Sequence, residues 1–592
     1  MPLDILSRRS FLVTSAAAAG ASLLPAAAQP AEAWTDLPMP AASGPLETNL
    51  DAYIAAYMPA MNAPGMTLGL TDAKATRRVA GYGYANIDRR IPVSPDHLYE
   101  IGSISKSFVT LVVLQLHEEG KLDLHKPILD YLPDLPILCE VGPITPHHLL
   151  THTSGLPDDS FLFAADPAAR LVQGFAPGAH FRYCNAGFCI LGLLAEKLAG
   201  SPWRILAQER ILNPLGMSQT SPVLTQANRD RAATGYQAFR QDVVYPRQGR
   251  LAIAPDLVSD ETDGCIASTP GDMARYARML LNRGAGPSGR ILSEESFALM
   301  STPWIKAPDF SDTASYGYGI AVDTLDGHRI LRHTGGMVAF ASSIHVDLDG
   351  GVACFASINA MQGYRPTAVT EYTVRLLRAE RESKPLPAPP PIADARDVDN
   401  AQDYAGAFTA ADGRTMTFAA QGKRLALVEG SASIVLQHLG GDRFISTDPG
   451  AFATHTIVFG RKSAPAGADA GGKGMQRPVE VSYGPDWYLA PGYDGPRSFS
   501  VPAEYGLYTG RYHSDSPWGG DTFVYVRKGQ LFADSSRLTP LGNHVFRIGE
   551  EDWNPDVVTF YHVFQGKARG LRATGLDFFR VDVGDHLQMP GT

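Results

Sequence analysis

Ser103 and Lys106 stand three residues apart at the start of an apolar stretch, within Gly102–Phe108 (GSISKSF). If this stretch is a helix, positions i and i+3 share a face and the two side chains can meet. A serine hydroxyl is a weak nucleophile until a neighbouring base takes its proton, and a lysine can be that base where burial and nearby cations lower its pKa. The N-terminus of the helix would add positive potential beneath a developing oxyanion. No other lysine of the chain follows a serine at this spacing, so the pair predicts a lysine-activated nucleophile.

Two further short motifs follow this pair in the chain. Tyr183-x-Asn185 comes first, and His333-Thr334-Gly335 comes later, at the end of a strand pattern. Each motif has a second match, at Tyr84-Ala85-Asn86 and at His438-Leu439-Gly440. The former match precedes the serine helix in a glycine-rich turn, and the latter lies beyond a proline-rich linker. We therefore expect the Ser103 helix and the two motifs to converge on one site; a packing role at a strand end is the alternative for His333.

The elements that would position these residues follow from hydrophobic periodicity. Helices are expected over 46–61, from Ser103 to Gly120, and over 190–198, 270–281 and 367–380. Strands are expected over 65–70, 79–83, 316–320, 329–332, 341–347 and 351–359. A chain that runs from strands to helices, back to strands and into a closing helix predicts an α+β fold. We expect an αβ sandwich in which an antiparallel sheet is flanked by helices.

Proline enrichment marks the clearest domain boundary. Five prolines fall within 385–391, so residues 383–399 are predicted to be an extended linker after a first domain at 45–382. Two similar segments follow, opened by Tyr404–Phe408 and Tyr508–Tyr512 and each rich in short strand patterns. We predict two small antiparallel β-barrel-like domains at 400–497 and 503–592.

The N-terminus resembles a bacterial twin-arginine export signal. Ser7–Leu12 (SRRSFL) precedes a small, weakly apolar run, and cleavage after Ala28 or Ala33 would remove a signal peptide at 1–33. A short membrane anchor is the alternative. Export predicts a periplasmic or secreted protein with no integral membrane segment once the signal is removed.

Composition and spacing disfavour several other functions. The net charge is −10 and no basic cluster lies beyond the N-terminus, so nucleic acid is not an expected partner. His148 and His152 stand four apart, but no H-E-x-x-H motif surrounds them, so packing is the expected role and no metal or cofactor is predicted. The absence of G-x-S-x-G argues against an α/β-hydrolase.

Four segments together resemble the serine β-lactamase and penicillin-binding-protein superfamily, and more narrowly its class C β-lactamase, D-aminopeptidase and esterase branch. The segments are Gly102–Phe108, Leu149–Pro157 (LLTHTSGLP), Phe181–Asn185 (FRYCN) and His333–Gly336 (HTGG). The resemblance covers about residues 45–380. It implies a β-lactamase-like sandwich, followed by lipocalin-like β domains such as D-aminopeptidase-like members carry.

The resemblance also implies a role for each motif residue. Ser103 would be the acylated nucleophile, and Lys106 would take its proton. Tyr183 would carry protons to the leaving group and from the deacylating water, and Asn185 would orient Lys106 and the substrate amide. Because a tyrosine hydroxyl titrates near pH ~10, two neighbouring cations would have to lower its pKa.

The third motif departs from the usual pattern. Gly335 and Gly336 would bind substrate, with the backbone N–H groups of Ser103 and Gly336 as candidates for the oxyanion hole. β-Lactamases and transpeptidases usually carry lysine where this chain has His333, and a histidine is only partly charged near neutrality. The substitution is similar to that in D-aminopeptidase and some esterase members.

We therefore predict a serine hydrolase that forms an acyl-enzyme with a peptide amide or a carboxylic ester, of D-aminopeptidase or esterase type. One alternative is a β-lactamase or D-Ala-D-Ala carboxypeptidase. Another is a non-catalytic scaffold whose β domains bind a cell-wall or lipid ligand. The expected partner is a small-molecule, peptide or ester substrate, and the sequence defines no oligomeric state.

Overall fold

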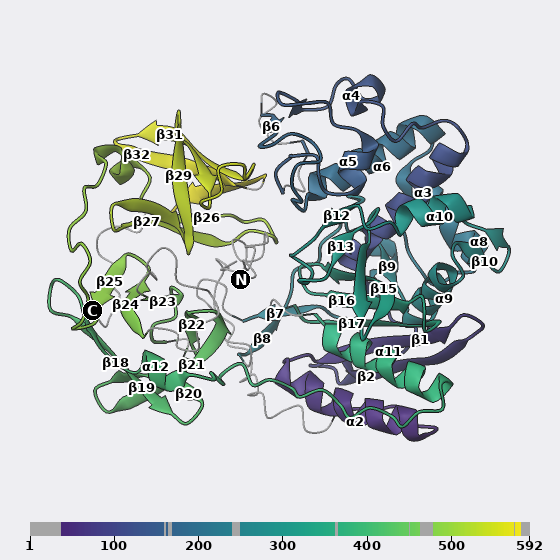
Figure 1. Ribbon diagram of the computed structural model, residues 1–592, viewed down its shortest axis with the longest axis horizontal. Coiled ribbons are helices and arrows are strands. Elements are labelled where there is room, and N and C mark those ends of the chain that lie inside the picture. Colours follow the sequence, from purple (N-terminus) through teal and green to yellow (C-terminus); the bar gives the residue numbers. More distant parts are fainter. Residues whose placement is uncertain are drawn as a thin grey trace.

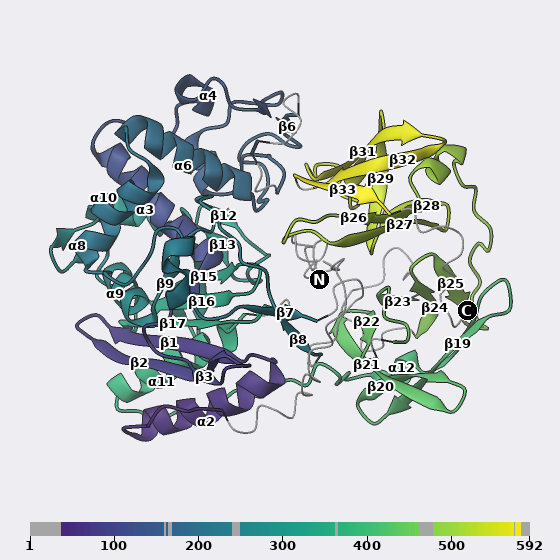
Figure 2. The same ribbon diagram turned by 180° about the vertical axis from the view of Figure 1, so that it is seen from behind.

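The computed structural model describes residues 37–158, 162–163, 169–239, 249–361, 365–448, 450–461, 477–573 and 575–581. Figure 1 shows an N-terminal α/β domain on one side and two β-barrels on the other, and Figure 2 shows the same arrangement from behind. The predicted signal peptide at 1–33 lies outside the described residues. Within them, no helix is both long and apolar enough to cross a bilayer.

A nine-stranded sheet forms the centre of the N-terminal domain, and every neighbouring pair of its strands is antiparallel. In spatial order the strands are β12 (Ile305–Lys306), β13 (Ser315–Tyr316), β14 (Ala321–Leu325), β15 (His328–Gly336), β16 (Ala341–Asp347), β17 (Val352–Ile358), β1 (Gly65–Asp72), β2 (Thr76–Asn86) and β3 (Ile91–Pro92). The first and last parts of the domain therefore meet at the β17–β1 pair. The sheet confirms the predicted α+β class.

Helices cover both faces of this sheet. The terminal helices α2 (Pro45–Ala60) and α11 (Thr367–Arg381) pack together on one face, where Met66, Leu68 and Leu70 of β1 join their core. Successive strand residues point to opposite faces, so Gly69 faces α9 (Pro270–Leu281) instead. A Cβ at Gly69 would lie 2.2 Å from the Pro270 carbonyl oxygen, which explains the glycine there.

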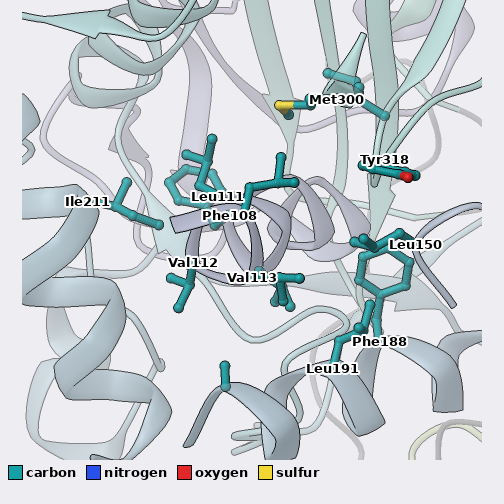
Figure 3. Packing of buried hydrophobic residues seen from close by; sticks show 14 of the residues in the cluster. Phe108, Leu111, Val112, Val113, Leu150, Phe188, Leu191, Ile211, Met300 and Tyr318 are labelled. Atoms are coloured by element: carbon teal, nitrogen blue, oxygen red, sulfur yellow. The ribbon is translucent and has the colours of Figure 1, made fainter. Parts of the chain in front are cut away.

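The helix that follows Ser103 lies inside the domain, as predicted. A 3-10 turn at Gly102–Ile104 leads into α3 (Ser105–Glu118), whose apolar side chains are buried all round. Figure 3 shows the surrounding packing. The labelled side chains come from α3 (Phe108, Leu111, Val112, Val113) and from its neighbours (Leu150, Phe188, Leu191, Ile211, Met300, Tyr318). A helix enclosed in this way holds its first turn rigidly.

Two of the differences from the predicted element boundaries affect the surroundings of the site. The strand expected over 316–320 ends at Tyr316, because the chain turns at Gly319 with φ +66°. A Cβ at Gly319 would lie 2.1 Å from the Thr110 hydroxyl of α3, so this turn packs directly on the helix. The helix expected from residue 190 begins earlier, as α6 (Asn185–Ala199), which places the Tyr183-x-Asn185 motif at its N-terminus.

Each of the two C-terminal regions is a closed eight-stranded antiparallel barrel, in agreement with the predicted class. The first contains β18 (Gly406–Thr409), β19 (Thr415–Gln421), β20 (Arg424–Glu429), β21 (Ala432–Gly440), β22 (Arg443–Ser446), β23 (Ile457–Arg461), β24 (Pro478–Tyr483) and β25 (Asp486–Leu489). The second contains β26 (Gly510–His513), β27 (Asp521–Arg527), β28 (Gln530–Ala533), β29 (Ser536–Gly542), β30 (Val545–Ile548), β31 (Val557–Phe564), β32 (Lys567–Ala573) and β33 (Leu576–Arg580).

The weak sequence repeat corresponds to the start of each barrel. Tyr404 and Tyr508 come just before the first strands and are buried in the two barrel cores, each of which is rich in aromatic side chains. Side chains therefore fill the interiors, as expected for small barrels.

Candidate active site

Ser103 lies in the 3-10 turn before α3, against the end of β15. The two segments approach so closely that only glycine fits at their contact. A Cβ at Gly102 would lie 2.3 Å from the Gly336 nitrogen, and one at Gly335 would lie 1.7 Å from the Ile101 carbonyl oxygen. Gly102 also has φ +55°, a conformation that other residues rarely adopt. This contact brings the predicted oxyanion-hole residue Gly336 next to the serine turn.

Lys106 is completely buried, and its ammonium group faces Ser103. Lys106 Nζ donates hydrogen bonds to Ser103 Oγ at 3.2 Å, to Asn185 Oδ1 at 2.7 Å and to the Asp263 carbonyl oxygen at 2.8 Å. A carboxylate oxygen of Asp263 lies 3.8 Å from the same nitrogen. Lys106 Nζ also lies 5.0 Å from the centre of the Tyr183 ring. The structure thus brings together four of the predicted residues: Ser103, Lys106, Tyr183 and Asn185.

The protonation of the Lys106–Tyr183 pair differs from the expectation. Burial lowers the pKa of Lys106, but the neighbouring Tyr183 and Asp263 outweigh this effect and raise the pKa above its usual value. Burial raises the pKa of Tyr183, and the positive charge of Lys106 offsets this only in part. The expected net lowering of both pKa values is not found: Tyr183 and Asp263 raise that of Lys106, and burial outweighs the effect of the Lys106 charge on Tyr183. In the resting protein the pair is an ammonium and a neutral phenol.

The turn that follows α5 (Pro146–Leu150) packs against the tyrosine motif and positions it. The His152 ring lies 4.2 Å from the Tyr183 ring and 5.1 Å from that of Phe188, and the backbone N–H of Cys184 donates to His152 Nδ1 at 3.0 Å. Cys184 is buried and caps α6, since its sulfur accepts the Gly187 N–H at 3.3 Å. Burial lowers the pKa of His152 well below its usual value, so this histidine is a neutral support beneath Tyr183.

His333 reaches the same region but is tied to the protein at both ring nitrogens. Nδ1 lies 2.6 Å from the Thr334 carbonyl oxygen, which can only accept, so Nδ1 carries the hydrogen. Nε2 then accepts from the Tyr316 hydroxyl at 2.9 Å. Burial, together with the positive charges of Lys106 and Arg332, lowers the pKa of His333 to about 3. The expectation of a partly charged histidine is therefore wrong, and His333 is neutral near pH 7.

Sequence reasoning missed several residues that complete the site. Asp263 contacts Lys106, Tyr316 contacts His333, and Asp158 Oδ1 accepts from Asn185 Nδ2 at 2.9 Å. The position of Asp158 directly after the Leu149–Pro157 segment was a usable signal. Asp263 lies in an ordinary polar stretch with no motif around it.

Among the described residues, one group of potential metal ligands lies beside the site: Cys189, Glu261 and Asp263 have ligand atoms within 4.8 Å of one another. Burial raises the pKa of the Cys189 thiol well above its usual value, and the thiol donates to Asp263 Oδ1 at 3.6 Å. An S–H···O hydrogen bond accounts for the contact between the Cys189 thiol and Asp263. His148 has a structural role, since it forms a capping box with Thr145 at the start of α5.

A serine paired with a lysine one turn away, at the foot of a buried helix and beside a strand ending in H-T-G, defines a class. It is the class of lysine-assisted serine hydrolases to which β-lactamases and penicillin-binding proteins belong. Residues 50–379, more than half of the chain, match the sequence model of the family described as Beta-lactamase, so the chain belongs to this family.

Similar proteins agree with this assignment. Penicillin-binding protein 4 of Amycolatopsis lactamdurans is 29% identical over 288 residues, which cover 44% of this chain and 72% of that protein. Penicillin-binding protein 4* of Bacillus subtilis (strain 168) is 24% identical over 383 residues, or 58% of this chain and 79% of that protein. The solved octameric penicillin-binding protein homologue from Pyrococcus abyssi shares the fold, with a TM-score of 0.53 at 24% identity over 75% of this chain and 100% of that chain.

Proposed function

We propose that the protein is a serine hydrolase that forms an acyl-enzyme on Ser103 during cleavage of a peptide amide or a carboxylic ester. The observation that carries this proposal is the 3.2 Å hydrogen bond between Lys106 Nζ and Ser103 Oγ in a buried site. A serine within hydrogen-bonding reach of a lysine has the geometry that nucleophilic catalysis requires.

Acylation would begin when the Lys106–Tyr183 pair has lost one proton. Ser103 Oγ would attack the substrate carbonyl carbon as its proton passes to this pair, and the backbone N–H groups of Ser103 and Gly336 would stabilise the oxyanion. Collapse of the tetrahedral intermediate would break the bond to the leaving group, which would take a proton through Tyr183. A water molecule would then attack the ester carbonyl carbon and give one proton to the same pair. The bond to Ser103 Oγ would break, the serine oxygen would take that proton, and the acid would leave.

The state of His333 favours aminopeptidase-like or esterase-like substrates. A neutral ring held by Tyr316 and Thr334 offers no positive charge to a substrate carboxylate, which a penicillin or a D-Ala-D-Ala peptide would present. The second candidate is β-lactam or D-Ala-D-Ala peptide recognition, and it is supported by the names of the two penicillin-binding relatives.

A substrate panel tests the proposal. Wild-type protein should hydrolyse p-nitrophenyl esters or D-aminoacyl anilides faster than L-aminoacyl anilides or nitrocefin, and the Ser103→Ala variant should be inactive on all of them. Turnover by Ser103→Ala equal to that of the wild type would refute the proposal. Ligand binding by the barrels without any hydrolysis by the whole protein would support a scaffold instead.

We also propose that residues 1–33 direct twin-arginine export to the periplasm or beyond. The support is the SRRSFL segment and the small apolar run that follows it. A fusion of residues 1–40 to a folded reporter should be exported, and Arg8→Lys with Arg9→Lys should retain the reporter in the cytoplasm. Equal export of both fusions would contradict this proposal.

A further inference from the structure

The second barrel reaches the candidate active site through the connection between β30 and β31, residues 549–556. On this loop the Trp553 ring stacks on the His180 ring at 4.4 Å and contacts the Phe175 ring at 5.6 Å. Three residues later, the buried carboxylate of Asp556 forms an ion pair with Arg182, the residue directly before Tyr183. A residue 374 positions after Arg182 therefore lies beside the Tyr183 motif.

Asp556 also holds the segment that contacts Asn185. The backbone N–H of Asp158 donates to Asp556 Oδ1 at 2.9 Å, and this bond is buried. The carboxylate of Asp158 accepts from Asn185 Nδ2 at 2.9 Å, and Asn185 Oδ1 accepts from Lys106 Nζ at 2.7 Å. A continuous series of hydrogen bonds thus runs from the second barrel to the lysine that contacts Ser103.

The chemistry of this series permits one orientation of the Asn185 amide. An ammonium group can only donate and a carboxylate can only accept, so the amide oxygen must face Lys106 and the amide nitrogen must face Asp158. Removing the Asp158 carboxylate would leave the amide nitrogen without this acceptor, so the Asn185 side chain would no longer be held in one position. The oxygen that accepts from Lys106 would then be less precisely placed, and so would the lysine nitrogen beside Ser103.

We propose that Asp158 and Asp556 are positioning residues for Lys106, acting through Asn185, and that the second barrel is thereby part of the active site. This inference rests on the proposed function. Neither carboxylate need touch substrate; each fixes the place of a group that does. A displacement of about 1 Å in a catalytic group can reduce a rate roughly 100-fold, so the loss of either anchor should reduce turnover.

Active-site titration of the full-length protein tests the proposal. The variants are Asp556→Ala, Asp556→Asn, Asp158→Ala and Asp158→Asn, and the control is Asp552→Asn, an exposed carboxylate on the same loop. A fluorophosphonate counts the reactive serines, and ester hydrolysis then gives kcat per titrated site and KM. We expect kcat per site to fall about 10- to 100-fold in the two alanine variants, with KM for a small ester little changed.

The asparagine variants separate positioning from simple loss of a domain contact. Asp158→Asn keeps an oxygen that accepts from Asn185, so it should retain most of the wild-type kcat, whereas Asp556→Asn should lie between the wild type and Asp556→Ala. A purely structural role would lower the fraction of titratable protein and leave kcat per titrated site unchanged. The inference would be overturned if Asp158→Ala and Asp556→Asn both had the same kcat per titrated site as the wild type. This test applies even if Asp556→Ala does not fold.

Failure of the proposed function would look different. In that case the wild-type protein would neither be titrated by the fluorophosphonate nor hydrolyse the ester. A wild type that is titrated, with variants that match it per site, would refute only the positioning roles.

Discussion

The two barrels use the same connection, between their fifth and sixth strands, to contact different neighbours. In the first barrel the β22–β23 loop carries His455, whose ring lies 5.2 Å from Phe523 and 5.5 Å from Tyr525 of the second barrel. In the second barrel the β30–β31 loop carries Trp553 and Asp556 to the N-terminal domain. The chain therefore forms a series of contacts, from the first barrel to the second and from the second to the candidate active site (Figure 1).

This difference shows that the shared architecture of the barrels does not define their roles. Both are closed eight-stranded barrels with aromatic cores, and the strands themselves offer no distinction. What differs is the chemistry of one loop. A half-buried histidine in the first barrel packs on aromatic rings, whereas a buried carboxylate in the second pairs with an arginine beside the tyrosine motif.

Replacement of Lys106 should give the largest loss of activity, with which the effects of substitutions in the two loops can be compared. Lys106→Ala removes the group that contacts Ser103 and leaves Asn185 without its donor, so we expect kcat/KM for an ester to fall about 1,000-fold or more. Steady-state kinetics measures the change, with circular dichroism as the control for folding. A fall of less than tenfold would mean that the lysine does not activate the serine.

The next largest expected effect is the change of kcat/KM with pH. Because the pKa values of Lys106 and Tyr183 are both raised, the pair is protonated near neutrality and the reactive form increases with pH. We expect kcat/KM for a neutral ester to rise about tenfold per pH unit between pH 6 and about pH 9.

Neither His455 of the first barrel nor His333 of the candidate site should affect the dependence of kcat/KM on pH. Burial lowers the pKa of His455 to about 4 and that of His333 to about 3, so both are neutral throughout the range. A plateau below pH 7.5 would show that the Lys106–Tyr183 pair is already deprotonated near neutrality and would contradict this account.

Matched substitutions in the two loops test the comparison itself. Trp553→Ala removes the stacking on His180 and loosens the loop that holds Asp556, so we expect kcat/KM to fall about tenfold. His455→Ala removes a similar ring contact from the first barrel, and we expect a loss of roughly 2 kcal/mol in stability with kcat/KM unchanged.

Steady-state kinetics measures kcat/KM of both variants, and thermal unfolding measures their stability. Equal losses of activity in Trp553→Ala and His455→Ala would mean that the two loops do not differ in function. Wild-type kcat/KM in both variants would show that the second barrel does not contribute to the active site.

The smallest effect concerns the attachment of the first barrel. Asp394 in the linker pairs with Arg396 at 2.7 Å and with Arg424 of β20 at 3.3 Å. Hydrogen bonds from Arg396, together with the positive charges of both arginines, lower the pKa of Asp394 to about 2. The stabilisation is present above pH ~4 and is lost as pH falls towards ~2. Since the carboxylate is partly exposed, Asp394→Asn should cost about 1 kcal/mol or less at pH 7.

Thermal unfolding at a series of pH values measures this contribution. The gap between wild type and Asp394→Asn should narrow below pH 4, and kcat/KM should be the same in both. A gap that is constant from pH 7 to pH 3 would show that the ionised carboxylate is not the source.

Much of the candidate site could be predicted because its motifs are local. Ser103 and Lys106 are one helical turn apart, and Tyr183 and Asn185 are two residues apart, so short-range geometry governs each pair. The barrels were predictable from strand patterns and from the repeat at Tyr404 and Tyr508. The predicted domain boundaries and the roles of the site residues stay predictions.

The electrostatics of the site could not be predicted in this way. The pKa of Lys106 depends on Asp263, which folding brings next to it from 157 residues away. The neutrality of His333 depends on its burial and on Tyr316, and neither follows from the H-T-G motif. Asp556 could not be predicted from the sequence, because its contacts with Arg182 and Asp158 form only where the second barrel meets the N-terminal domain.

Mass spectrometry of the protein after reaction with a fluorophosphonate tests the central claim most directly. The account predicts a single covalent adduct on the peptide that contains Ser103, and none in Ser103→Ala. It also predicts slower adduct formation in Asp158→Ala than in the wild type. An adduct on a different residue, or no adduct on the folded wild-type protein, would contradict the claim that Ser103 is the nucleophile.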